Sequence, residues 1–183
     1  MGLGRTQKYF KTMRKFLWFL ALGFCYPIMS EAQMEGSGTA DDPYQVRTAF
    51  DLFDVRANLT AHYKLMNDID LTEWIAEESP SQGWSPIGTV ATPFEGNFDG
   101  NKKSIKGLYI NKPTVDNVGL FGVLNNATIH HLCLISPIIK GASFVGPIAG
   151  FTLTVGTGIS SINNNSVIGG QLMGNNSLVV CKA

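Results

Sequence analysis

Gly119-Leu120-Phe121-Gly122 decides the fold of this chain, because it recurs in looser form as Gly146-Pro147-Ile148-Ala149-Gly150. Each copy is followed by a short apolar segment and then by a bend rich in Asn or Gly. Recurrence of one unit along a chain is typical of repeat architectures, in which the units stack on one another. The recurrence therefore favours a coil of stacked rungs over a two-sheet sandwich.

Short apolar segments separated by Gly, Asn, Asp and Pro fill the chain from Tyr63 onward. Such segments predict strands of a few residues joined by turns, and they argue against an alternating α/β fold. Three segments look like copies of one strand position: Ile105–Ile110, Ile129–Leu134 and Ile159–Val167. We expect an all-β protein whose Ile, Leu, Val and Phe side chains face a shared interior.

Residues 48–59 predict a single amphipathic helix ahead of these strands. Thr48 is a good N-cap residue, and Asp51 three residues later resembles the acid of a capping box. We expect this helix to cap the first open end of the stack, where a bare strand edge would otherwise be exposed. Residues 33–47 form the N-terminal segment before it and end in the predicted strand Tyr44-Gln45-Val46.

Residues 1–32 predict a signal peptide. Five basic residues precede the apolar run from Phe16 to Ile28, and Ser30-Glu31-Ala32 provides small residues before a cleavage site between Ala32 and Gln33. The run is shorter than the roughly 20 residues of a membrane span, so an uncleaved anchor is the weaker alternative. We expect an exported product, either secreted, on the cell surface or periplasmic.

Cleavage changes the charge of the chain from neutral to mildly acidic. Five of the 14 basic residues and one of the 14 acidic residues lie in the leader, which leaves nine basic and 13 acidic residues, a net charge of −4. Nucleic acids and anionic membranes bind to basic patches, and a domain with this net negative charge lacks such a patch. We therefore expect no nucleic-acid partner and no membrane span in the processed chain.

Several segments together resemble GLUG-motif repeat proteins. They are Asp68-Ile69-Asp70-Leu71-Thr72, Trp84-Ser85-Pro86-Ile87-Gly88, Phe94-Glu95-Gly96-Asn97-Phe98-Asp99-Gly100-Asn101, Ile105-Lys106-Gly107-Leu108 and Gly119-Leu120-Phe121-Gly122. The resemblance covers roughly residues 36–180. It implies a short right-handed parallel β-helix, here over residues 60–183, of the kind found in bacterial surface and secreted proteins. These include adhesin-like proteins and the non-catalytic parts of some IgA1-cleaving metallopeptidases.

The resemblance implies no catalytic residues for this chain. GLUG repeats usually continue beyond the point at which this sequence stops, so we expect a β-helix truncated at its C-terminal end. An open last rung exposes unpaired strand edges, through which copies of the chain are expected to associate.

The acidic and histidine residues give no clear catalytic or metal site. Asp68 and Asp70 would share one face of a strand, but capping of backbone donors explains them better than Ca²⁺ binding or acid–base chemistry. Asp99 before Gly100 suits a turn. On an extended strand, the adjacent His130 and His131 would face opposite ways and could not bind one metal ion. We therefore expect no enzyme activity, no metal and no cofactor.

Three aromatic residues are the candidates for ligand contact: Trp74, Trp84 and Tyr109. Aromatic rings can stack on sugars, although in a small domain they more often fill the core. Trp74 is the best of the three, since Glu73, Glu77 and Glu78 surround it in a predicted projecting loop. Cys133 and Cys181 are the two cysteines that remain after cleavage, and burial without a bond is favoured over a disulfide.

The sequence thus predicts an exported adhesin-like binding module without catalytic activity, whose partners are host or glycan surface ligands. Two alternatives remain. One is a carbohydrate-active β-helix enzyme, for which the only basic cluster, Lys102-Lys103-Lys106, lies beside Asp99. The other is a truncated structural spacer from a larger surface protein.

Overall fold

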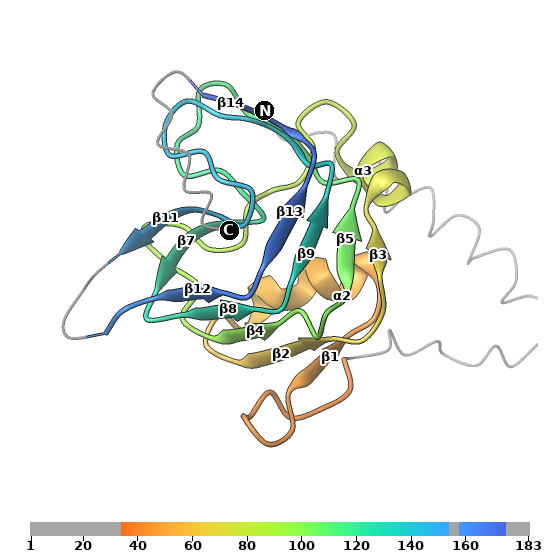
Figure 1. The fold of residues 1–183 in the computed structure, drawn as a ribbon, viewed down its shortest axis with the longest axis vertical. Coiled ribbons are helices and arrows are strands. Elements are labelled where there is room, and N and C mark those ends of the chain that lie inside the picture. The colour runs from red at the N-terminus through yellow and green to blue at the C-terminus, as the bar shows by residue number, and fades with distance from the viewer. Residues whose placement is uncertain (1–33, 154–157, 175–183) are drawn as a thin grey trace, which may run out of the picture. The chain divides into compact units, whose positions relative to one another are not determined.

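The computed structural model describes residues 34–153 and 158–174, and within these residues short strands coil into a β-solenoid of about three turns (Figure 1). Every ladder between the named strands is parallel. The predicted all-β, right-handed parallel β-helix with an N-terminal capping helix is confirmed. The predicted signal peptide, residues 1–32, lies outside the described residues.

Four parallel sheets form the sides of the coil, and from residue 97 onward the chain passes through them in turn. The first sheet contains β1 (Tyr44–Val46), β2 (His62–Leu65), β4 (Asn97–Asp99), β8 (Thr128–His130) and β12 (Ser161–Asn163). The second contains β3 (Ile69–Asp70), β5 (Ser104–Lys106), β9 (Cys133–Ile135) and β13 (Ser166–Ile168). The third contains β6 (Tyr109–Asn111), β10 (Ile138–Lys140) and β14 (Gln171–Met173), and the fourth contains β7 (Phe121–Asn125) and β11 (Ala149–Leu153).

Register partners stack directly above one another even though the rungs differ in length. Asn97, Thr128 and Ser161 are successive partners in the first sheet, 31 and 33 residues apart along the chain. Because side chains alternate between the two faces of a strand, the central residue of most strands points inward and is buried, as Phe98 and Ile129 are. The coil interior is therefore one continuous apolar core.

The register also corrects the predicted alignment of the copies. Ile105 pairs with Leu134, and Leu134 with Val167, whereas Ile129 pairs with Phe98 and Ile162. Ile105 and Ile129 therefore occupy different sides of the coil. Both positions hold a short apolar strand followed by a bend, so the local pattern did not distinguish them.

The recurring glycine motif forms the fourth side of the coil, and its copies are neighbours in space. The Leu120 and Phe121 amides donate to the carbonyls of Pro147 and Ile148, at 3.1 and 2.9 Å. A third copy lies one rung earlier, where the Gly122 amide donates to the Ile87 carbonyl at 2.8 Å. The predicted stacking of these motifs is confirmed.

The predicted capping helix forms as α2 (Ala49–Asp54), which continues as the 3₁₀ turn η2 (Val55–Ala57). The capping box is present: the Asp51 amide donates to Thr48 Oγ1 at 3.1 Å, and the Thr48 amide donates to Asp51 Oδ2 at 2.9 Å. Leu52 and Val55 are fully buried, so the helix closes the interior at the first strand, β1 (Figure 1). In the first rung, α2 and η2 follow β1 in place of strands on the other three sides of the coil.

A second helix, α3 (Thr72–Glu78), replaces the loop that we predicted around Trp74. The Asp70 carboxylate accepts hydrogen bonds from the Thr72 amide at 3.0 Å and the Thr72 hydroxyl at 2.7 Å, which fixes the start of the helix. Ile75 is buried and Trp74 half-buried, while Glu73 and Glu77 face solvent. Our prediction of a single helix was wrong because a segment of seven residues is too short to show helical periodicity.

An aromatic cluster of Phe53, Trp74 and Trp84 joins the two helices to the coil. The ring centroids of Phe53 and Trp74 lie 5.1 Å apart, and those of Trp74 and Trp84 lie 5.3 Å apart. The Arg56 guanidinium lies 4.4 Å from the Phe53 centroid and 4.5 Å from that of Trp84, and it donates to the carbonyls of Phe53 and Ser85. Burial lowers the pKa of Arg56 to about 10, so it stays charged at neutral pH.

No helix within the described residues has the length and apolar character needed to cross a bilayer.

Candidate functional site

A left-handed backbone turn follows β8 at the corner between the first and second sheets. β8 ends at His130, and His131 has a φ of +55°. Asn164 holds the same position after β12, with a φ of +52°. Asn tolerates this conformation better than most residues, and the Asn predicted to form a bend here does so. The corner therefore reverses the direction that an extended His131 would take.

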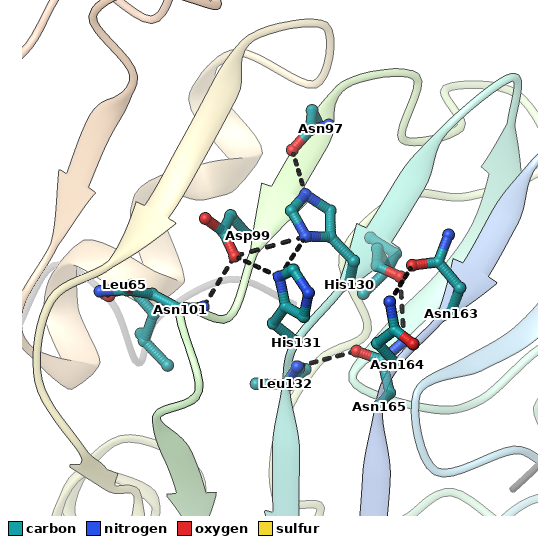
Figure 2. A network of polar contacts seen from close by, with 11 residues as sticks. Leu65, Asn97, Asp99, Asn101, His130, His131, Leu132, Asn163, Asn164 and Asn165 are labelled. Carbon is teal, nitrogen blue, oxygen red and sulfur yellow. Dashed lines mark hydrogen bonds and ion pairs between the residues drawn. The ribbon is translucent and has the colours of Figure 1, made fainter.

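This turn brings both imidazoles onto the carboxylate of Asp99, which is the register partner of His130 on β4 (Figure 2). The two Nδ1 atoms lie 2.8 Å apart, and each lies 3.4 Å from Asp99 Oδ1. The expectation that the two histidines face opposite ways was wrong, because it assumed an extended strand through both. The three residues form one cluster, which we call the Asp–His–His cluster.

Polar neighbours hold the members of the Asp–His–His cluster in place. Asn97 Oδ1 lies 3.3 Å from His130 Nε2, and the Asn101 amide donates to Asp99 Oδ1 at 2.8 Å. The side chains are partly exposed, with 21% of His130, 40% of His131 and 26% of Asp99 accessible to solvent. Neighbouring polar groups thus orient the cluster, and its side chains remain accessible to solutes.

Asp68 and Asp70 bind backbone and hydroxyl donors, as we expected. Asp68 Oδ1 accepts from the Ser104 amide at 2.7 Å and the Ser104 hydroxyl at 3.0 Å, and these bonds lower the pKa of Asp68. The hydroxyl and amide of Thr72 lower the pKa of Asp70 to about 2, with a further contribution from Lys106, whose Nζ lies 3.1 Å away. Both carboxylates stabilise corners of the coil.

Replacing Asp70 by asparagine is expected to make the free energy of unfolding depend less on pH between about pH 4 and 2. The folded-state pKa lies below the value of about 3.9 in unfolded chains, so the ionised carboxylate stabilises the fold above about pH 4. That contribution disappears as the pH falls toward 2. Urea unfolding of the wild type and Asp70→Asn between pH 7 and 2 measures the difference, which is small because Asp70 is exposed.

Asp41→Asn is the matched control, since Asp41 is an exposed turn residue. If the free energy of unfolding of Asp70→Asn fell with pH as steeply as that of the wild type, the role assigned to this carboxylate would be contradicted.

The three aromatic candidates do not form one surface. Trp84 is fully buried, and its indole N–H donates to the Leu120 carbonyl at 3.2 Å. A ligand cannot reach it without opening the core, so Trp84 is withdrawn as a contact residue. Trp74 and Tyr109 are half-buried and remain candidates. No periodic pattern surrounds Trp84, so its burial could not be predicted from the neighbouring residues.

Two residues of the group that the enzyme alternative requires, Lys106 and Asp99, contact different partners. Lys106 pairs with Asp70, while Asp99 faces the two histidines. Cys133 carries a free, partly buried thiol, and Cys181, its only predicted disulfide partner, lies outside the described residues.

An apolar hollow of about 850 Å³ opens on the inner side of β11 to β14. Phe144, Ile148 and Leu172 contribute to its walls. Val167, Ile168 and Met173 on the last described strands are exposed. Association of copies through this rung stays a prediction.

Comparison with known proteins gives two relatives in sequence, and no protein-family model matches the chain. A candidate Gly-rich membrane protein of Evansella cellulosilytica is 40% identical over 121 residues, which is 63% of this chain and 14% of the relative. Halomucin of Haloquadratum walsbyi is 32% identical over 158 residues, 79% of this chain and 2% of halomucin. The chain therefore spans only a small part of both relatives.

Among solved structures, a candidate immunoglobulin A1 protease from Bacteroides ovatus is similar in fold, with a TM-score of 0.54 and 22% sequence identity. The match covers 73% of this chain and 40% of that protein. At this identity the likeness concerns the fold alone, and it agrees with the parallel β-solenoid described above. The resemblance to GLUG-motif repeats stays a prediction.

Proposed function

We propose that this chain is a non-catalytic, adhesin-like binding module of an exported surface or secreted protein, with glycan or other host surface ligands. The observation that carries the proposal is a row of polar side chains on the outer face of the first sheet. Lys64, Asp99, His130 and Asn163 are register partners on four successive strands. Neighbouring strands lie about 4.8 Å apart, so the row offers polar groups at regular intervals.

A regular row of donors and acceptors suits a polymer whose own polar groups repeat, and polysaccharides have this property. None of the four residues is buried, so their outer atoms are accessible. Half-buried Trp74 on α3 adds a ring on which a sugar could stack. These features support a binding surface along the side of the coil.

The relatives support an extracytoplasmic setting. The Evansella relative is described as a membrane protein, and the first 32 residues of this chain have the order of basic, apolar and small residues that export signals use. A non-catalytic module fits a chain that covers a small part of both relatives. The spacer alternative differs from this proposal in requiring no ligand.

Glycan-array binding of the exported product tests the proposal. The variant Lys64→Ala with Asn163→Ala removes two members of the row and leaves the Asp–His–His cluster intact. The matched control, Lys140→Ala with Thr152→Ala, changes two exposed residues on other sides of the coil. We expect glycan binding that the first pair weakens at least 10-fold and the control pair preserves.

Trp74→Ala, compared with Phe144→Ala as an exposed aromatic control, tests the stacking ring separately. An array on which the wild type binds no glycan or host surface protein would overturn the proposed function and favour the spacer.

A further inference from the structure

We infer that the Asp–His–His cluster of Asp99, His130 and His131 binds one divalent transition-metal ion, with Zn²⁺ as the probe ion. This inference does not depend on the proposed function. It rests on the separation of the three ligand atoms, on the residues that orient them, and on the mixed nitrogen and oxygen donor set.

The separations of the ligand atoms fit a single ion. Zn²⁺ binds imidazole nitrogen and carboxylate oxygen at about 2.0–2.2 Å, so tetrahedral ligands lie about 3.3–3.5 Å from one another. Asp99 Oδ1 lies 3.4 Å from the Nδ1 atoms of both His130 and His131. The two nitrogens lie 2.8 Å apart and need to separate by about 0.5 Å, a small rotation for the partly exposed ring of His131.

The hydrogen bonds around the cluster orient His130 and Asp99 as ligands of a central cation. Asn97 Oδ1 can only accept, and it lies 3.3 Å from His130 Nε2, so the His130 tautomer that makes this hydrogen bond carries its proton on Nε2 and offers Nδ1 to a cation. Metal-binding histidines usually donate their second ring N–H to an oxygen in this way. The Asn101 amide holds Asp99 Oδ1 from outside the cluster, as the partners of carboxylate ligands do.

The donor set selects the class of metal. Two imidazoles and one carboxylate suit Zn²⁺, Cu²⁺, Ni²⁺ or Fe²⁺, whereas Ca²⁺ and Mg²⁺ prefer oxygen ligands throughout. The side chains remain 21–40% exposed, so water can complete the coordination shell. The site thus has three protein ligands and room for a fourth ligand from solvent.

The backbone at His131 provides a conservative test variant. The residue adopts a left-handed conformation that Asn164 adopts at the same corner of the next rung. Asparagine is therefore compatible with this corner, and His131→Asn removes a metal ligand while keeping the fold. Asp99→Asn is a second such variant, because its amide oxygen can still accept from Asn101. His62→Gln is the matched control, since His62 lies in the same sheet on β2 and outside the cluster.

Competition titration of Zn²⁺ between the full chain and a chromophoric chelator tests the inference. We expect one Zn²⁺ per wild-type chain, unchanged binding by His62→Gln, and a loss in affinity for His131→Asn and Asp99→Asn that exceeds the roughly 10- to 100-fold effect of removing an orienting residue. Co²⁺ bound to the wild type is expected to give visible absorption bands that both cluster variants lose. Circular dichroism and thermal melting of the metal-free variants establish that they are folded.

Zn²⁺ binding by the wild type that is no tighter than binding by the folded cluster variants would overturn the inference. An equal loss in His62→Gln, or displacement of Zn²⁺ by equimolar Ca²⁺, would also overturn it. Glycan binding is measured separately, so failure of the metal site leaves the proposed function standing.

Discussion

Replacement of Trp84 by alanine is expected to lower the free energy of unfolding by about 3–5 kcal/mol, the range for large aromatic residues in cores. Trp84 is fully buried, and its ring packs on Trp74 and makes a T-shaped contact with Phe53, 6.2 Å away between centroids. The substitution leaves a cavity beneath both helices and removes the hydrogen bond to the Leu120 carbonyl. It also removes the ring on which Arg56 rests.

Urea unfolding followed by circular dichroism measures this loss. Trp74→Ala is the comparison, because Trp74 belongs to the same cluster but is only half-buried, and a smaller loss is expected. Equal losses of unfolding free energy for the two variants would show that the full burial of Trp84 contributes no more stability than the partial burial of Trp74.

Replacement of Gly122 by alanine is expected to destabilise the coil by about 3 kcal/mol or more, at the upper end of the range for overpacking. A Cβ atom at Gly122 would lie 2.5 Å from the Gly88 carbonyl oxygen and 3.1 Å from that of Asn117. Both are backbone atoms, and the closer one, the Gly88 oxygen, belongs to the preceding rung, where the Ile87 carbonyl accepts from the Gly122 amide. Relief of the clash therefore requires the rungs to separate.

Gly169→Ala is the matched control in the same chain. Gly169 has a φ of +66°, but its added Cβ would meet only the flexible Ser136 hydroxyl, at 3.3 Å. Ser136 itself adopts a φ of +48° at the same corner one rung earlier, so a side chain is tolerated there. We expect a loss of about 1 kcal/mol for this variant. Losses of similar size at Gly122 and Gly169 would contradict the steric argument.

Local sequence signals predicted the parts of the fold that depend on neighbouring residues. The capping box of Thr48 and Asp51 fixed the start of α2, and the two copies of the glycine motif predicted the stacking of the fourth side. Both signals lie within short segments whose geometry follows from residue type. The predicted alignment of the copies was wrong, because register depends on pairing between residues that lie 29 to 33 positions apart.

The Asp–His–His cluster was missed for a related reason. Asp99 and His130 meet only because β4 and β8 pair in one register, and the side on which His131 lies depends on a single backbone angle. The available signal was the comparison of corners: His131 occupies the position of Asn164, a residue typical of left-handed turns. An alignment of the rung sequences that matched His131 with Asn164 would have placed both histidines beside Asp99.

The constancy of register despite unequal rung length bears on how such coils evolve. Asn97, Thr128 and Ser161 stay aligned although the intervals between them differ by two residues, so the corners absorb the difference. Gene duplication can therefore copy a whole unit of about 30 residues into the array without disturbing its neighbours, provided that the buried strand centres are kept. Mutations that lengthen a connection add residues to the outer surface of the coil and leave the shared apolar core unchanged.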